Sequence, residues 1–197
     1  MVYKQKKKKR ARVVVPIVLI AAIILGVLGY FGYQKLLYEK YPLKYESYVE
    51  KYSKENNLDK YFVYAVIKTE SGFNPEAVSN VGARGLMQIM EDTFDWIKYK
   101  RGDEEAVYYD MYLAENNIDY GCWLLGYLYE EFGNIEAVAA AYHAGRGTVN
   151  EWLEDERYSS DGKHLDVIPT SDTAHYVDKI KSAVDMYIKL YKTERKN

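Results

Sequence analysis

A run of 21 residues without a charged side chain, residues 13–33, constrains this chain more than any other feature. As a helix rising about 1.5 Å per residue, the run would be about 30 Å long, which matches the hydrocarbon core of a bilayer. Seven Lys and Arg residues precede it, and the positive-inside rule then keeps residues 1–12 in the cytoplasm. Tyr30, Phe31 and Tyr33 stand where an aromatic belt would meet the opposite interface. The sequence therefore predicts a transmembrane helix over residues 13–33.

The competing interpretation of this run is a cleavable signal peptide. Such a peptide has an apolar core of about 7–15 residues followed by a cleavage site with small side chains. Here the apolar run is longer, and it ends in Gly-Tyr-Phe-Gly-Tyr-Gln (residues 29–34), which offers no such site. We therefore expect an uncleaved signal anchor, which makes the chain a single-pass membrane protein with its carboxyl-terminal part outside the cytoplasm.

The charges of the chain are divided between its two parts. Residues 1–38 hold eight of the 27 basic residues and no acid, so the remainder has 19 basic residues against 29 acids. This distribution excludes a nucleic-acid binder that is basic throughout, and 15% aromatic residues exclude a disordered polyampholyte. The basic tail could contact nucleic acid, but beside a membrane span a topological role explains it better. We expect no nucleic-acid partner.

The part beyond the anchor predicts one helical domain. Residues 34–42 form the expected linker, residues 43–191 the domain and residues 192–197 a polar tail. Apolar residues recur at intervals of three and four over 45–52 and 62–69, and further helices are expected over 118–132, 135–143 and 171–191. No stretch alternates convincingly as a strand, so the predicted fold class is all-α or nearly so.

Disulfide and metal chemistry find little support in the sequence. A single cysteine, Cys122, cannot form an intramolecular disulfide, and its apolar neighbours indicate a buried small side chain. The three histidines, His143, His164 and His175, show no spacing typical of metal ligands. We expect neither a metal site nor a cofactor.

The residue best suited to acid chemistry is Glu70. It falls in the last turn of an expected apolar helix that Gly72 and Pro75 bring to an end. The partial negative charge of a helix carboxyl end disfavours an ionised acid, and apolar neighbours such as Val66 add a desolvation cost. Both effects favour a protonated carboxylic acid near neutral pH, which is what a general acid for glycoside cleavage requires. The alternative interpretation of Glu70 is a solvated surface glutamate.

Three further blocks follow Glu70 in order. They are Gly-Leu-Met-Gln at 85–88, Tyr-His-Ala-Gly at 142–145, and Ile-Pro at 168–169 with Tyr-Val at 176–177. With the Glu-Ser pair at 70–71, this series resembles the soluble-lytic-transglycosylase (SLT) family, a lysozyme-like group that cleaves bacterial peptidoglycan. The resemblance covers about residues 43–191. It implies a lysozyme-like SLT domain facing the cell wall, with peptidoglycan as the partner and protein partners unknown.

Carried over position by position, the resemblance implies roles for individual residues. Glu70 would be the catalytic acid/base. Five positions would contact the glycan or line the pocket: Ser79, Gln88, Met90, Tyr142 and Tyr176. His143 stands where the family usually has Asn, and an imidazole reproduces only part of an amide's hydrogen bonding. Two interpretations of His143 are left open: a substrate-binding residue, and a packing substitution without a binding role.

The resemblance also implies a reaction. Glu70 would protonate the oxygen between N-acetylmuramic acid and N-acetylglucosamine, the acetamido group would stabilise the sugar cation, and the C6 hydroxyl would close a 1,6-anhydro ring. Most glycosidases need two carboxylates. The nearby acids Glu76, Glu91, Asp92 and Asp95 are expected to be solvated. A hydrolytic muramidase on the same fold, and a catalytically weak wall-binding scaffold of a secretion or conjugation machine, remain as alternatives.

Overall fold

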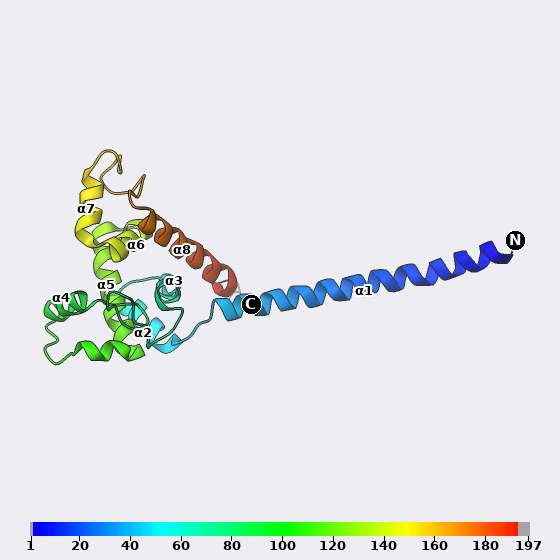
Figure 1. The fold of residues 1–197 in the computed structure, drawn as a ribbon, viewed down its shortest axis with the longest axis horizontal. Helices are drawn as coiled ribbons and strands as arrows, with labels where there is room; N and C mark the ends of the chain where they lie inside the picture. The colour runs from blue at the N-terminus through cyan, green and yellow to red at the C-terminus, as the bar shows by residue number, and fades with distance from the viewer. Residues whose placement is uncertain (1, 193–197) are drawn as a thin grey trace. The chain divides into compact units, whose positions relative to one another are not determined.

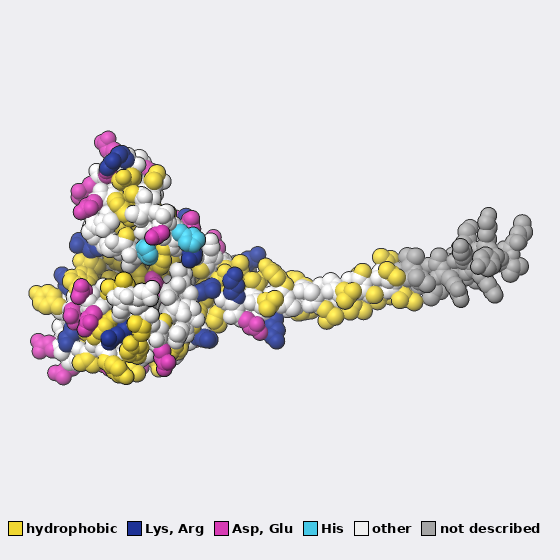
Figure 2. Space-filling view, in the orientation of Figure 1, with side chains coloured by type: hydrophobic (Ala, Val, Ile, Leu, Met, Phe, Trp, Pro, Cys, Tyr) yellow, Lys and Arg dark blue, Asp and Glu magenta, His cyan; other side chains and the backbone are white. Residues whose placement is uncertain are grey.

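The amino-terminal apolar run lies within one long helix, α1 (Val2–Lys40), in the computed structural model, which describes residues 2–192, with side chains from residue 16 onward. Pro16 lies inside this helix. The 25-residue stretch Pro16–Lys40 contains an apolar window with a mean hydropathy of 2.2, and it is long and apolar enough to cross a membrane. The side chains of residues 16–33 are exposed, as Leu25 is at 69%, and Figure 2 shows the apolar groups along the helix. No other described helix is of this kind.

The described residues separate into two units between Pro42 and Leu43. The predicted span, residues 13–33, lies inside α1, and the helix continues through most of the stretch expected to be a linker. In the polar tail expected at 192–197, residues 193–197 lie outside the described residues.

The second unit is built from helices, as the sequence predicts, and Figure 1 labels the main ones. Isolated backbone bridges are its only β-type pairing within residues 43–192. The elements after α1 are α2 (Glu46–Glu55), α3 (Lys60–Ser71), α4 (Glu91–Arg101), the 3₁₀ turn η1 (Tyr108–Tyr112), α5 (Ala114–Phe132), α6 (Ile135–Ala144), α7 (Arg146–Glu154), α8 (Ser171–Tyr187) and the π-helical turn η2 (Ile188–Lys192).

Helix α3 is the centre of this unit. Every residue from Tyr61 to Ile67 is buried, because α2 and α8 both pack against the helix. The Asp59 side chain starts α3 by accepting from the Tyr61 N–H at 2.7 Å, and Gly72 ends it in a left-handed conformation (φ 60°). A helix buried on all sides positions its last turn rigidly, and that turn carries Glu70.

Helices α5 and α6 form the other wall of the unit. Helix α5 packs against α2 and α6, and α6 packs against α8. Gly133 ends α5 with φ 70°, and the Asn134 side chain starts α6 by accepting from the Ala137 N–H at 2.9 Å. These boundaries agree with the predicted helices at 118–132 and 135–143. Helices α4 and α7 were not predicted from the sequence. Apolar periodicity is weak in α4, whereas α7 is amphipathic.

A folded turn segment, residues 74–90, connects α3 to α4. Arg84 forms isolated antiparallel bridges with Val78 and with Ile89, including an exchange of N–H to C=O hydrogen bonds with Ile89 at 2.9 and 3.0 Å. Tyr108 donates its hydroxyl to the carbonyls of Gly82 and Ile89 at 2.8 and 2.9 Å, respectively. The segment therefore has a fixed conformation although it contains no helix or continuous strand.

Candidate active site

Glu70 lies half-buried in the last turn of α3, where the sequence places it. Burial in this environment raises the pKa of its carboxyl to about 7, and a hydrogen bond from Tyr176 opposes the shift. Desolvation raises the pKa because it penalises only the charged form, and it is the larger of the two effects. At neutral pH a substantial fraction of Glu70 is therefore protonated and able to donate a proton.

Tyr176 provides the hydrogen bond that Glu70 receives. It lies on α8, is buried at 7% exposure, and donates its hydroxyl to Glu70 Oε1 at 2.6 Å. Burial, followed by the charge of Glu70, raises the pKa of Tyr176 well above the ordinary tyrosine range. The phenol thus stays a proton donor, and it occupies one carboxyl oxygen of Glu70 and leaves Oε2 for other partners.

Tyr142 lies on the last turn of α6, and its hydroxyl donates to the carbonyl of Met87 at 2.7 Å. Burial, followed by the charge of Glu70, raises the pKa of Tyr142 well above its usual value. The two tyrosines therefore differ in what they hold: Tyr176 contacts the carboxyl itself, and Tyr142 fixes the backbone of the turn segment.

His143 contacts Tyr176 rather than Glu70. The two rings lie 4.7 Å apart between centroids and are tilted by 31°, and His143 Nδ1 lies 3.1 Å from the Thr173 hydroxyl oxygen. Thr173 is buried on the first turn of α8. The imidazole thus packs on the tyrosine that holds Glu70 and remains exposed on its other side.

Ser79 and Gln88 are engaged within the turn segment. The Ser79 hydroxyl oxygen accepts from the N–H groups of Val81 and Ala83 at 3.3 and 3.0 Å. The Gln88 side-chain amide donates to the carbonyls of Ala77 and Gly85 at 3.1 and 2.9 Å. The sequence left a ligand as one candidate partner for the Gln88 amide, and here its donors are satisfied by backbone.

Met90 is the last residue of the turn segment, and Ser71 is the last residue of α3, three positions before the segment begins. Met90 directly precedes α4 and is 37% exposed. The Ser71 hydroxyl, next to Glu70, donates to the carbonyls of Leu86 at 2.8 Å and Ile67 at 3.2 Å. Ser71 therefore ties the end of α3 to the same backbone that Tyr142 holds from α6.

Comparison with known proteins agrees with this geometry. The family model for the transglycosylase SLT domain matches residues 47–165, more than half of the chain. The chain belongs to the SLT domain family. It is 35% identical over 160 residues to the soluble lytic murein transglycosylase of Salmonella typhimurium. The matched region covers 77% of this chain and 24% of that protein.

Two further SLT relatives are a protein of solved structure and a membrane-bound protein. The 70-kDa soluble lytic transglycosylase of Escherichia coli has a solved structure that superposes with a TM-score of 0.69 at 29% identity, over 78% of this chain and 25% of that one. The membrane-bound lytic murein transglycosylase C of Serratia proteamaculans is 30% identical over 178 residues, covering 76% of this chain and 48% of that protein. The chain thus spans about a quarter of its soluble relatives and half of this membrane-bound one.

The lysozyme-like fold predicted for an SLT domain is confirmed by these comparisons. Within the fold, Glu70 is the acid with a strongly raised pKa among the described residues. The four other acids that the sequence expected to be solvated are all exposed: Glu76, Glu91, Asp92 and Asp95. Residues 16–192 contain no group of three His, Cys, Asp or Glu side chains placed to hold a metal ion.

One residue that organises this SLT site was missed from the sequence. Asn117 on α5 is fully buried, accepts from the Met87 N–H at 2.7 Å and donates to the carbonyls of Arg84 and Met111 at 2.9 and 2.8 Å. It lies in Asn-Asn-Ile-Asp, where its neighbour Asn116 gives the same local signal. The only clue in the sequence is that Asn117 is a polar residue on a helix face whose other residues are apolar.

Proposed function

We propose that this protein is a membrane-anchored peptidoglycan lytic transglycosylase that cleaves the β-1,4 bond between N-acetylmuramic acid and N-acetylglucosamine. The proposal depends mainly on one observation, a half-buried glutamate whose pKa is raised to about 7 within the region that the SLT domain model matches. A single carboxylate of this kind suits a reaction in which the substrate supplies the second group.

The first step uses the protonated form of Glu70. Because Tyr176 donates to Oε1, the acidic proton is assigned to Oε2, which donates it to the oxygen that leaves with N-acetylglucosamine. As the C1–O4 bond breaks, the carbonyl oxygen of the muramic acetamido group bonds to C1 and takes up the positive charge. The carboxylate left on Glu70 keeps the hydrogen bond from Tyr176, which is stronger to a charged acceptor than to a neutral one.

In the second step Glu70 acts as a base. Its Oε2 accepts the proton of the muramic C6 hydroxyl while that oxygen attacks C1 and displaces the acetamido oxygen. The product is 1,6-anhydro-N-acetylmuramic acid, no water is consumed, and Glu70 returns to its protonated form. A pKa near 7 suits both steps, since the acid and the base forms are then both accessible at neutral pH.

We further propose that α1 is an uncleaved signal anchor, with residues 1–12 in the cytoplasm and residues 43–191 on the cell-wall side. The Lys and Arg residues before the span, the exposed apolar side chains of α1 and the membrane-bound relative support this topology. Membrane fractions should retain the full-length chain. Mature protein that begins near residue 35 in the medium would contradict the anchor.

The activity is tested with the full-length chain in detergent on purified peptidoglycan. The wild type should release muropeptides with anhydro ends, which are lighter by one water than hydrolysed ends in mass spectrometry. Glu70→Gln should lower the rate by at least about 10³-fold because the proton donor is lost. Glu76→Gln, at an exposed acid six positions away, is the matched control and should keep wild-type activity.

The outcomes separate the alternatives. Full-mass reducing ends would indicate a muramidase that uses water in place of the C6 hydroxyl. Wall binding without cleavage would indicate a scaffold. Equal digestion by the wild type and Glu70→Gln would reject Glu70 as the acid.

A further inference from the structure

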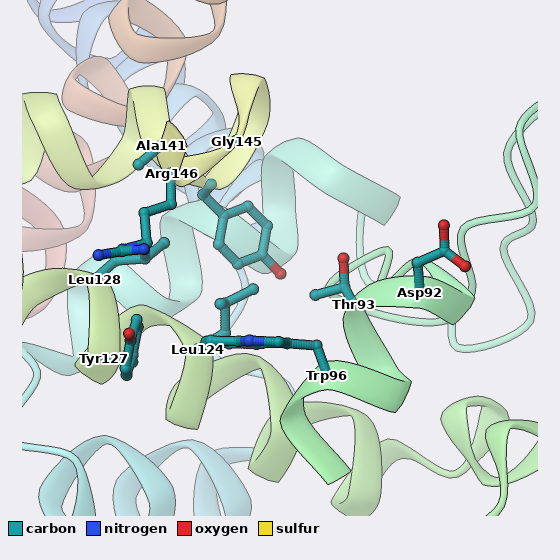
Figure 3. A pocket seen from close by; sticks show the side chains of 10 residues that line it. Asp92, Thr93, Trp96, Leu124, Tyr127, Leu128, Ala141, Gly145 and Arg146 are labelled. Carbon is teal, nitrogen blue, oxygen red and sulfur yellow. The ribbon is translucent and has the colours of Figure 1, made fainter. Parts of the chain in front are cut away.

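Tyr142 and His143 are consecutive residues on the last turn of α6, but they face different parts of the molecule. Tyr142 lines a hollow of about 350 Å³ between α4, α5 and α6. Figure 3 shows this hollow with three other residues from the corner of α6 and α7: Ala141, Gly145 and Arg146. His143 does not line it. Because successive residues of a helix point about 100° apart, the His143 side chain lies instead on the side of α6 that packs against α8.

The imidazole of His143 covers one face of the Tyr176 ring. The two ring centroids lie 4.7 Å apart and the ring planes are tilted by 31°, which is close to a stacked arrangement. Aromatic pairs at such a separation stabilise each other beyond the area that they bury. Tyr176 is buried, whereas His143 is exposed. The phenol is therefore covered on this side by an imidazole that itself reaches solvent.

A buried hydroxyl orients this imidazole. His143 Nδ1 lies 3.1 Å from the Thr173 hydroxyl oxygen, and Thr173 is 3% exposed on the first turn of α8. The two groups can share one proton in either tautomer of the imidazole. Thr173 and Tyr176 are three residues apart and lie on the same face of α8, so the imidazole contacts both. Two contacts with one helix give His143 a defined orientation although it lies at the surface.

Tyr176 reaches Glu70 through a single atom. Its hydroxyl donates to Glu70 Oε1 at 2.6 Å and has no other hydrogen-bond partner within residues 16–192. In the same part of the chain, the ring of Tyr176 contacts one other aromatic ring, that of His143. A hydrogen bond weakens steeply when its angle departs from linearity, so a small rotation of the phenol would weaken the bond to Glu70.

We propose that His143 is a positioning residue that holds the Tyr176 ring in the orientation from which its hydroxyl donates to Glu70. The imidazole acts through the phenol and does not itself transfer a proton. The ring contact carries this role, and the bond to Thr173 orients the ring. This inference rests on the proposed function, because it assumes that Glu70 is the acid.

The charged groups around the imidazole do not offer another route to Glu70. On α8, Asp172 and His175 are exposed and form no hydrogen bond or ion pair with the imidazole. On the α5 and α7 side of α6, Arg146 and Glu131 are paired with each other. Among the described residues, the phenol of Tyr176 is the titratable group that the imidazole contacts.

The pKa of Glu70 reports the position of the Tyr176 hydroxyl without any turnover. It is followed by ¹³C NMR of labelled glutamate carboxyl groups in the full-length chain in detergent. Tyr176→Phe alone should raise the pKa of Glu70 by about 1, because a donor to the charged form is lost. In a chain that also carries His143→Ala, the same change should raise it by less than about 0.5, because the hydroxyl is no longer held at Oε1. This difference measures the coupling between the two residues, and the separate effect of each substitution cancels in it.

Two further substitutions separate the ring of His143 from its hydrogen bond. His143→Phe keeps a ring on Tyr176 and loses the bond to Thr173, so the full effect of Tyr176→Phe should be retained. His143→Asn introduces the residue usual in the SLT family, which can bond to Thr173 but has no ring, so the effect should fall as it does with His143→Ala. His175→Ala is the matched control, because His175 is an exposed histidine next to Tyr176 that forms no hydrogen bond with it. It should retain the full effect.

Thermal unfolding verifies that each variant is folded. Folded His143→Ala and His143→Asn chains that keep the full effect of Tyr176→Phe would overturn the inference. An unchanged pKa of Glu70 on Tyr176→Phe alone would overturn it as well, because no hydrogen bond would then exist to be positioned. A loss of the effect in His143→Phe with retention in His143→Asn would show that the bond to Thr173 matters and not the ring, which also contradicts the inference.

Digestion of peptidoglycan by the wild type separates this inference from the proposed function. Digestion without coupling between His143 and Tyr176 refutes the positioning role alone. Coupling in a chain that digests nothing supports the positioning of Tyr176 by His143 and refutes the enzymatic proposal.

Discussion

The carboxyl end of α3 and the turn segment 74–90 lie against each other at the candidate site, but they are stabilised differently. Glu70 is positioned by its own helix, which is buried along most of its length and ended by Gly72. The turn segment has no regular element of its own, and its backbone is held by Asn117 from α5, Tyr142 from α6 and Tyr108 from η1. The position of Glu70 therefore depends on residues close to it in the chain, whereas the conformation of the turn segment depends on residues that are distant in the sequence.

The α3 end and the turn segment should therefore respond differently to substitutions. Changes at distant positions such as Asn117 should disturb the turn segment and leave the α3 end intact. Changes at Glu70 or Tyr176 should alter proton chemistry without unfolding the segment.

The largest expected effect is on the turn segment, where two glycines form a matched pair. Gly85 has φ +76°, and a Cβ there would meet the Met111 carbonyl at 2.1 Å and the Asn117 amide at 2.2 Å. Gly85→Ala should therefore lower the free energy of unfolding by about 3–4 kcal/mol. Gly82 also has positive φ (+88°) but an open environment, so Gly82→Ala should lower it by about 1 kcal/mol. Chemical denaturation measures both, and equal losses would contradict the close packing of Gly85.

The next effect concerns the buried amide that holds the segment. Asn117→Asp keeps the shape but removes both donors to the carbonyls of Arg84 and Met111, so it should lower the free energy of unfolding by about 3 kcal/mol. Asn116→Asp is the control and should change it by less than about 1 kcal/mol. If the two variants were equally stable, the proposed support of the turn segment from α5 would be wrong.

A pH-dependent effect is expected at the α3 end. The pKa of Glu70 rises from 4.5 to about 7 on folding, so its contribution to stability is complete below pH 4.5 and is lost as the pH rises through 7. Glu70→Gln cannot ionise and avoids this loss. The variant should therefore gain about 3 kcal/mol relative to the wild type between pH 4.5 and pH 8. Denaturation of both proteins at the two pH values measures the gain, and a constant difference would contradict it.

The smallest effect separates the two tyrosines. Tyr176→Phe removes a donor to the charged form of Glu70, so the pKa of Glu70 should rise and the alkaline limb of the pH–rate profile should move up by about 1 unit. Tyr142→Phe frees the Met87 carbonyl instead and should lower the rate while moving this limb less. Rate profiles from pH 5 to 9 test the contrast, and an unmoved limb in Tyr176→Phe would refute the assigned hydrogen bond.

Local signals made part of this structure predictable from sequence. The apolar run of α1, the burial pattern of α3, and the glycines that end α3 and α5 all depend on residues close together in the chain. The place of Glu70 at the end of α3 and the rise of its pKa were predictable for the same reason, since helix position and apolar neighbours are local. Tyr142 and Tyr176 were proposed as site residues only through the ordered blocks of the family.

Long-range contacts made the rest unpredictable. The partner that Asn117 holds lies 30 residues earlier, at Met87, and no local pattern distinguishes this residue from Asn116. The turn segment has helix-breaking glycines at 82 and 85 but no regular periodicity, so its bridges could not be anticipated. The packing of α4 against α5 could not be anticipated either, because α4 itself shows weak apolar periodicity.

The most direct test of the account is the pKa of Glu70 in the folded protein. Carboxyl carbons of glutamate labelled with ¹³C can be followed by NMR from pH 4 to 9 in the full-length chain, with Glu70→Gln identifying the signal. The account predicts a midpoint near 7, which Tyr176→Phe raises further. A midpoint near 4.5, the ordinary value for glutamate, would show that Glu70 is ionised at neutral pH and would contradict its role as the proton donor.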